Sequence, residues 1–117
     1  LRQTGIPVAF SSDAPVIDPN PWPGIYAILE RSSQRAASRP FSEYVPSGQM
    51  YQALYAYTVA AARAEGLASF KGSLVGGKLA DLVVSSISHH EAMANPENVS
   101  AVVTIINGQI VRDVLTQ

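Results

Sequence analysis

The stretch "FSSDAPV", residues 10–16, offers a single carboxylate at a place where enzymes do chemistry. An apolar run from Ile6 to Phe10 stops at two serines and is followed by Asp13. Barrel enzymes carry their reactive groups at the carboxyl ends of parallel strands. An aspartate there can bind a metal ion and take a proton from metal-bound water. Asp-Ala-Pro equally suits an aspartate that caps the following turn through its own side chain, and the local residues leave both interpretations open.

The glycine-rich stretch Gly72 to Lys78, "GSLVGGK", matches the first seven positions of a phosphate-binding P-loop. The eighth position is Leu79, where a P-loop has the Ser or Thr that binds Mg²⁺. A P-loop also follows a strand and opens a helix, whereas here a strand comes afterwards. We therefore interpret this stretch as a turn before a strand.

The other polar motifs are weaker indications of a site. His89 and His90 point to different sides of any helix or strand, and no third metal ligand follows at a useful spacing, so an exposed loop is favoured. "NVS" at Asn98 fits a glycosylation sequon, although nothing else in the sequence indicates secretion. A triad of Ser12, His89 and Asp13 lacks the nucleophile-elbow pattern, and we discount it.

Composition narrows the class of protein. The 117 residues suit one domain with a modest core, and 47% hydrophobic against 15% charged residues argues against long disorder. The net charge is −1 and the basic residues are scattered, which disfavours nucleic-acid and membrane partners. No apolar stretch is long enough to span a membrane. The absence of cysteine suits the cytoplasm, which is the expected location.

The first half of the chain predicts one buried strand and then helices. The run Ile6 to Phe10 does not alternate, which is typical of a strand buried on both faces. A loop stiffened by prolines is expected from Asp13 to Gly24. A helix follows from Gly24 to Gln34, with Ile25, Ile28 and Leu29 on one face. The polar stretch Ser32 to Ser47 reads as a connection, in which Ser47 is a candidate helix cap.

A second helical region is expected from about residue 50 to Gly66. Its apolar residues recur at steps of three and four, as in an amphipathic helix. Thr58 is a candidate cap for a second helix that abuts the first, and Gly66 is expected to end it. The apolar stripe consists of Met50, Leu54, Tyr57 and Ala61.

The last third of the chain predicts antiparallel strands. Asp81 to Ser86, "DLVVSS", reads as a strand. The stretch "AVVTIINGQIVRDV" reads as a hairpin, because Asn107-Gly108 is the pair favoured in a two-residue type I′ turn. The predicted fold class is therefore α/β. A lone parallel-type strand cannot satisfy its own edges, so we expect partners from self-association or from sequence beyond this chain.

Three stretches resemble the carboxyl-terminal end of the amidohydrolase superfamily, and most closely amidohydrolase family 3, which includes the YtcJ-like proteins. "GIPVAFSSDAPV" is similar to the family's last barrel strand, which ends in Ser-Ser-Asp. "YQALYAYTVAAARAEG" is similar to its helix ending in Tyr-Thr-x-Asn-Ala-Ala, with Ala60 in the place of the Asn. "KGSLVGGKLADLVV" and "VVTIINGQIV" are similar to the strands that return to its small β domain.

The resemblance implies a function for Asp13. In this superfamily the Asp after the eighth strand binds a divalent metal, usually zinc, and activates the hydrolytic water. Substrates are typically C–N bonds of amides, cyclic ureides or amidine-like rings. The proline loop would form one wall of the active site, and Lys78 and Asp81 would be structural. The family's His-x-His and its later metal ligands are absent from these 117 residues, so the chain by itself is expected to be inactive.

The resemblance implies a carboxyl-terminal segment of a metal-dependent hydrolase. Residues 1–70 would supply the last strand and outer helices of a (β/α)8 barrel, and residues 71–117 part of a β-sandwich. Leu1 to Thr4 look like the last turn of a helix, which also suggests a fragment of a longer protein. The expected partners are a small-molecule substrate and further copies of the chain. The alternative is a non-catalytic regulatory or oligomerising module that uses the same piece of fold.

Overall fold

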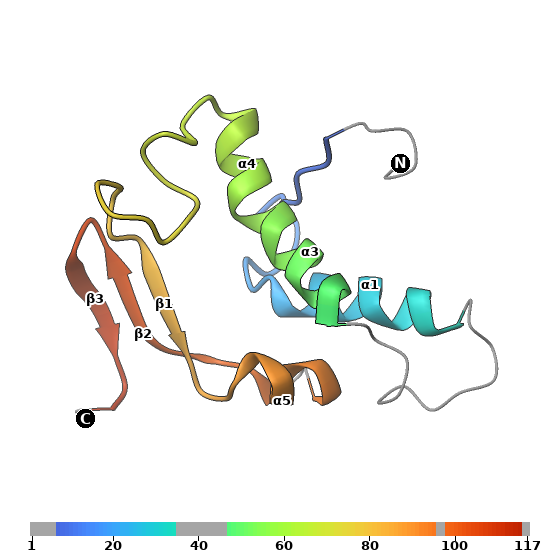
Figure 1. The fold of residues 1–117 in the computed structure, drawn as a ribbon. Helices are drawn as coiled ribbons and strands as arrows, with labels where there is room; N and C mark the ends of the chain where they lie inside the picture. Colours follow the sequence, from blue (N-terminus) through green and yellow to red (C-terminus); the bar gives the residue numbers. More distant parts are fainter. Residues whose placement is uncertain (1–6, 35–46, 96–97, 116–117) are drawn as a thin grey trace.

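The computed structural model describes residues 7–34, 47–95 and 98–115. In this part of the chain, helices come first and a small antiparallel sheet follows, so the α/β class is confirmed (Figure 1). The elements in chain order are α1 (Trp22–Gln34), α3 (Ser47–Tyr57), α4 (Val59–Ala64), β1 (Leu82–Ser85), α5 (His89–Ala94), β2 (Ala101–Ile106) and β3 (Gln109–Asp113).

The segment predicted as a buried strand is not one in this structure. Ile6 lies outside the described residues, and residues 7–10 run without a strand ladder. Val8 and Phe10 are half-buried, whereas Pro7 and Ala9 are exposed. The N–H of Phe10 donates instead to the carbonyl of Ala56 in α3, 3.1 Å away. The described chain offers this segment a helix and no neighbouring strand, and a strand needs another strand to pair with.

Helix α1 begins at Trp22, two residues before the predicted start. Side chains of the preceding loop hydrogen-bond the backbone at the start of this helix. The Asn20 N–H donates to Asp18 Oδ1 at 2.7 Å, and the Trp22 N–H donates to Asn20 Oδ1 at 3.1 Å. Pro23 is tolerated because the first turn of a helix has no internal partner for its N–H. The helix extends to Gln34, as predicted, so residues 32–34 are helical rather than part of a connection. The rest of that predicted connection, 35–46, lies outside the described residues.

The second helical region is divided at Thr58, as predicted. Helix α3 begins at Ser47, which is its first residue rather than a flanking cap, and ends at Tyr57. The Thr58 hydroxyl donates back to the carbonyl of Leu54 at 2.7 Å and makes no cap bond to α4. Gly66, at φ +76°, terminates α4. Its N–H donates to Arg63 O and that of Leu67 to Ala62 O, which is a Schellman motif.

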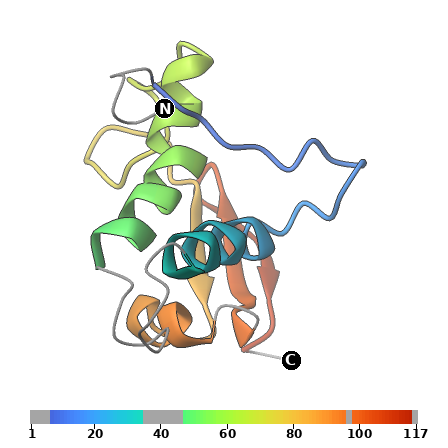
Figure 2. The same cartoon turned by 90° about the vertical axis from the view of Figure 1, so that its right-hand side faces the viewer.

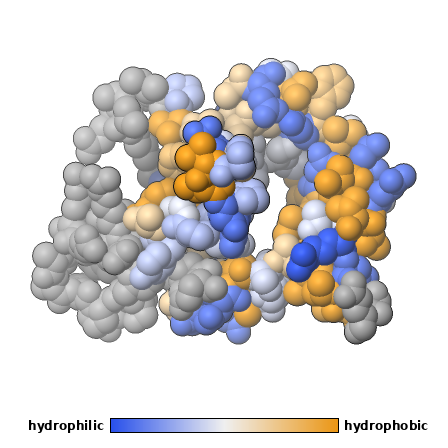
Figure 3. All heavy atoms as spheres, turned by 180° about the vertical axis from the view of Figure 1, so that it is seen from behind, coloured by the Kyte–Doolittle hydropathy of each residue, from blue (hydrophilic) through white to orange (hydrophobic). Residues whose placement is uncertain are grey.

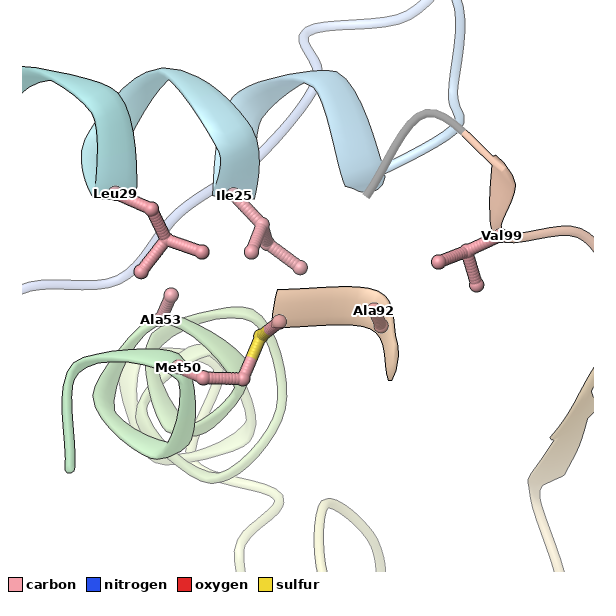
Figure 4. Packing of buried hydrophobic residues seen from close by; sticks show 6 residues of the cluster. All are labelled: Ile25, Leu29, Met50, Ala53, Ala92 and Val99. Carbon is pink, nitrogen blue, oxygen red and sulfur yellow. The ribbon is translucent and has the colours of Figure 1, made fainter. Parts of the chain in front are cut away.

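The core lies where α1, α3 and α5 meet (Figure 4). Ile25 and Leu29 of α1 are fully buried and face Met50 and Ala53 of α3, which confirms the predicted face of α1. Of the stripe predicted for the second helical region, Met50 is buried, Leu54 and Tyr57 are partly buried against the cluster, and Ala53 takes a place that the stripe did not include. The side chains that form this cluster are Ile25, Leu29, Met50, Ala53, Ala92 and Val99.

A loop from Leu67 to Asp81 joins the helices to the sheet. Lys78 holds it together, because its Nζ donates to the carbonyl of Ala68 and to Ser73 Oγ, the latter at 2.8 Å. Gly72, at φ +93°, lies against α4, and a Cβ there would stand 2.7 Å from the Cβ of Ala62 and 3.1 Å from Thr58 O. This loop therefore needs glycine at residue 72.

The three strands form a sheet in the order β1-β2-β3, antiparallel throughout. Asn107 and Gly108 connect β2 to β3 with φ of +50° and +78°, the left-handed pair that a type I′ turn requires, which confirms the predicted hairpin. Asp81 Oδ1 accepts from the Asn107 N–H at 2.8 Å, and the carbonyl of Ala80 accepts from the Gly108 N–H at 3.0 Å. The chain entering β1 thus supports the hairpin turn, in agreement with a structural role for Asp81.

The helices do not pack against this sheet within the described part of the chain. Apolar side chains of the strands are consequently open to solvent, and Figure 3 shows hydrophobic residues on the sheet surface at the right of the view. Those more than half exposed are Val83, Ile106, Ile110 and Val111. Among the described helices, none is both long and apolar enough to cross a membrane.

Replacing Gly72 by Ala should lower the free energy of unfolding by about 1–3 kcal/mol, because the new Cβ is strained by the positive φ and crowds α4. Gly76→Ala in the same loop is the matched control, since a Cβ there has no neighbour within 4 Å. Urea unfolding followed by circular dichroism measures both. Equal stability of the two variants would contradict the close approach at Gly72.

Replacing Asp81 by Ala should destabilise the fold by about 0.5–1.5 kcal/mol, the usual contribution of one hydrogen bond. The loss should concentrate at the turn, so amide hydrogen exchange at Asn107 should speed up more than exchange in α3. Asp81→Asn retains an acceptor oxygen and should behave nearly like the native chain. An unchanged exchange rate at Asn107 in Asp81→Ala would show that this bond does not support the turn.

Candidate functional site

Asp13 lies in an exposed turn at the start of the proline loop. Its φ is +54°, and the Val16 N–H donates to its carbonyl at 2.9 Å, closing a four-residue turn. The Ala14–Pro15 peptide bond inside this turn is cis. This turn separates the extended segment from the rest of the loop.

The serines before Asp13 supply the local side-chain hydrogen bonds. Ser11 Oγ accepts from the Asp13 N–H at 3.2 Å, and Ser12 Oγ accepts from the Ala14 N–H at 3.3 Å. The Asp13 carboxylate itself has no partner among the described residues, so the aspartate does not cap the turn with its side chain. A carboxylate presented in this way is available to a ligand.

The loop that carries Asp13 is anchored at both ends by contacts with Tyr57 of α3. On the upstream side, the Phe10 ring meets the Tyr57 ring edge-on, with centroids 5.5 Å apart. On the downstream side, Gly24 of α1 packs so closely on the Tyr57 hydroxyl that a Cβ at residue 24 would overlap it. Tyr57 therefore contacts the residues that flank the loop, while the loop itself extends away from the helices (Figure 2).

The described residues do not complete a metal centre. No group of three or more His, Asp or Glu side chains gathers among them in a way that could hold a metal ion. A catalytic zinc needs about three protein ligands and an open position, so the described residues do not form a whole metal site.

The predicted exposed loop at His89 and His90 is the first turn of helix α5, although both side chains are exposed as predicted. The signal for this helix was present in the sequence as Ser88-x-x-Glu91, a capping box. Ser88 Oγ accepts from the Glu91 N–H at 3.2 Å, and the Ser88 N–H donates to Glu91 Oε2 at 2.9 Å. The pKa of Glu91 lies below its ordinary value. The hydrogen bonds that its carboxylate accepts from the Ser88 N–H and hydroxyl lower it most, and His90 lowers it less.

The remaining motifs form no site in the described part of the chain. No hydrogen bond joins Ser12, His89 and Asp13 there, so a triad is not assembled. The Gly72–Lys78 stretch is a turn that opens no helix, and the ammonium group of Lys78 is bonded within its own loop. Asn98 is exposed just before β2.

A hollow of about 500 Å³ lies between the extended segment and the helices. Ala60, which stands where the family that the sequence resembles has Asn, is buried and lines the hollow. Arg63 lies at its edge, with its guanidinium 5.7 Å from the centre of the Tyr55 ring and its Nη1 donating to the Tyr55 hydroxyl at 2.6 Å. The full lining consists of Pro7, Val8, Ala9, Tyr55, Ala60, Arg63 and Ala64.

The chain is α/β, has a free aspartate after an extended segment, and has a glycine-rich turn leading into an antiparallel sheet. These features fit the amidohydrolase class that the sequence resembles. The model of the amidohydrolase family matches residues 1–112, nearly the whole chain. This chain belongs to the amidohydrolase family.

One relative is the Protein LONG AFTER FAR-RED 3 of Arabidopsis thaliana. It is 33% identical to this chain over 104 residues, which are 87% of this chain and 17% of that protein. The chain thus spans about a sixth of the length of this curated relative. No solved structure matches the chain.

Proposed function

We propose that this chain is the carboxyl-terminal part of a metal-dependent hydrolase that cleaves C–N bonds of amides, cyclic amides or amidine-like rings. The observation that carries the proposal is the free Asp13 carboxylate, held in an anchored loop of a chain of the amidohydrolase family. Residues 1–70 are proposed to form the end of a (β/α)8 barrel, and residues 71–117 part of a β-sandwich domain. The antiparallel sheet lies wholly after the Leu67–Asp81 loop, which supports this division, while α5 of the second part packs with α1 and α3.

Asp13 is proposed to be one ligand of a divalent metal, with zinc as the proposed ion, and the base that takes the proton from the hydrolytic water. A bound zinc ion lowers the pKa of its water toward neutrality. The further ligands would come from parts of the protein outside this chain. The isolated chain would accordingly lack activity, and its substrate would be a small molecule bound by the whole protein.

The proposed location is the cytoplasm, on the ground that the chain contains no cysteine. Neither nucleic acid nor a membrane is proposed as a partner, because the basic residues are scattered and the net charge is −1.

A second candidate function is a non-catalytic module that regulates or oligomerises. The observation in its favour is that both faces of the sheet expose apolar side chains, since Val83 and Ile110 lie on opposite faces and are each 62% exposed. Large exposed apolar patches usually mark interaction surfaces. This candidate requires no metal bound through Asp13, which separates it from the first.

In the full-length protein, Asp13→Asn should lower metal-dependent amide hydrolysis by about 10²–10⁴-fold, the usual contribution of a positioned acid–base group. The assay is release of 4-nitroaniline from acyl 4-nitroanilides by protein stripped of metal and refilled with Zn²⁺. Asp18→Asn is the matched control, because it lies in the same loop and keeps an acceptor oxygen for Asn20. Unchanged turnover in Asp13→Asn would remove Asp13 from the mechanism.

By itself, the 117-residue chain is proposed to self-associate. Of the N–H groups in residues 7–10, only that of Phe10 has a backbone partner in the described structure, and the sheet exposes apolar side chains. Sedimentation-velocity ultracentrifugation over a range of concentrations should show a mass above 12.4 kDa that rises with concentration. A monomer at all concentrations would contradict this.

A further inference from the structure

We propose that Asn107 is a site of spontaneous chemical modification, at which the Gly108 nitrogen displaces the side-chain amide as ammonia, and that two hydrogen bonds from the chain entering β1 hold this reaction back. The inference concerns the hairpin turn of the sheet. It does not depend on the proposed hydrolase function.

The residue that follows an asparagine decides whether the reaction can occur. The attacking atom is the backbone nitrogen of the next residue, and it must carry a proton that it can lose. A side chain on that residue crowds the attack, and glycine has none. Asn107 is followed by Gly108, and both residues are exposed to water.

The other asparagines of the sequence lack such a neighbour. Asn20 and Asn95 precede prolines, whose nitrogen carries no proton. Asn98 is exposed but precedes Val99, whose branched side chain crowds the nitrogen. The chemistry of the neighbours therefore singles out Asn107, and Asn98 serves as an internal comparison.

The folded turn engages the groups that the reaction needs. The Gly108 N–H, which must lose its proton, donates to the carbonyl of Ala80 at 3.0 Å. The Asn107 N–H donates to Asp81 Oδ1 at 2.8 Å. An amide held in a hydrogen bond gives up its proton mainly when the structure opens locally. The reaction at Asn107 therefore waits for the turn to separate from Ala80 and Asp81.

The reaction balances with water as its co-reactant. Hydroxide removes the Gly108 N–H proton, the nitrogen forms a bond to Cγ of Asn107, and the bond from Cγ to Nδ2 breaks as ammonia leaves with a proton from water. Water then opens the resulting cyclic imide. Opening at Cγ gives aspartate in the normal backbone, whereas opening at the main-chain carbonyl gives isoaspartate, in which the backbone runs through Cβ and Cγ.

Both products weaken the turn that delayed them. Isoaspartate adds one backbone atom to a two-residue connection whose flanking partners are Ile106 and Gln109. Aspartate keeps the backbone but places a second carboxylate next to that of Asp81, which lies 2.8 Å from the nitrogen of residue 107. Like charges this close repel each other. Modification should thus loosen the β2–β3 hairpin.

The test follows Asn107 in the full-length protein, incubated in mildly alkaline buffer and sampled over time by peptide mapping with mass spectrometry. A free peptide of residues 103–112 gives the rate without the two hydrogen bonds. The native protein should form aspartate and isoaspartate at residue 107 at least about tenfold more slowly than the peptide, because two hydrogen bonds must open first. Asn98 should remain intact over the same period.

Asp81→Ala removes one of the two bonds and should speed the reaction at Asn107 by about twofold to tenfold over the native protein. Asp81→Asn keeps an acceptor oxygen and should stay close to the native rate. Gly72→Ala is the control for general loss of stability, since residue 72 lies against α4 and the described helices do not pack on the sheet. It should speed the reaction less than Asp81→Ala does.

Three results would overturn the inference. Residue 107 could be recovered as asparagine alone from both the native protein and Asp81→Ala, which would show that no modification occurs there. The native protein could react as fast as the peptide, which would show that the turn gives no protection. Gly72→Ala could speed the reaction as much as Asp81→Ala, which would show that general unfolding and not the contact with Asp81 controls it.

Discussion

The packing of α1 against α3 is the contact on which the position of Asp13 depends. Ile25 and Leu29 of α1 are fully buried against Met50 and Ala53 of α3, and dense apolar packing of this kind holds two helices in one relative position. The Asp13 loop ends at α1, while the segment before it is bonded to α3 through Phe10. One buried contact therefore determines where both ends of the loop lie, and Tyr57 of α3 contacts residues on both sides.

The rest of the loop follows from short-range hydrogen bonds. Backbone and serine groups satisfy the turn at Asp13, so the carboxylate is not needed there and stays free. The backbone bond from the Val16 N–H to the Asp13 carbonyl closes the turn, and the Val16 side chain is open to solvent. The sheet, by contrast, depends on its own local chemistry: Asp81 and Asn107-Gly108 hold it together without support from the helices.

Features with local causes could be predicted from the sequence. The Asn107-Gly108 hairpin, the end of α4 at Gly66 and the break at Thr58 each follow from the conformational preferences of one or two residues. Helix α5 was not predicted, although the sequence contains its capping box, Ser88-x-x-Glu91. The strand predicted at Ile6 to Phe10 is not formed by residues 7–10 in this structure, because a strand needs a partner strand and the described residues offer it none. For the site, the sequence predicted where Asp13 lies along the chain. It did not predict that the Asp13 carboxylate is free, because the sequence does not show that serine hydroxyls accept from the N–H groups of the turn.

The most direct test of the central claim is an anomalous-scattering map of the full-length protein, recorded at the zinc absorption edge from crystals grown with Zn²⁺. If Asp13 is a ligand, an anomalous peak should lie about 2.0–2.2 Å from one of its carboxylate oxygens, with the other ligands supplied by residues outside this chain. A metal peak that is fully coordinated elsewhere, with the Asp13 carboxylate out of contact, would contradict the claim that this loop exists to present a metal ligand.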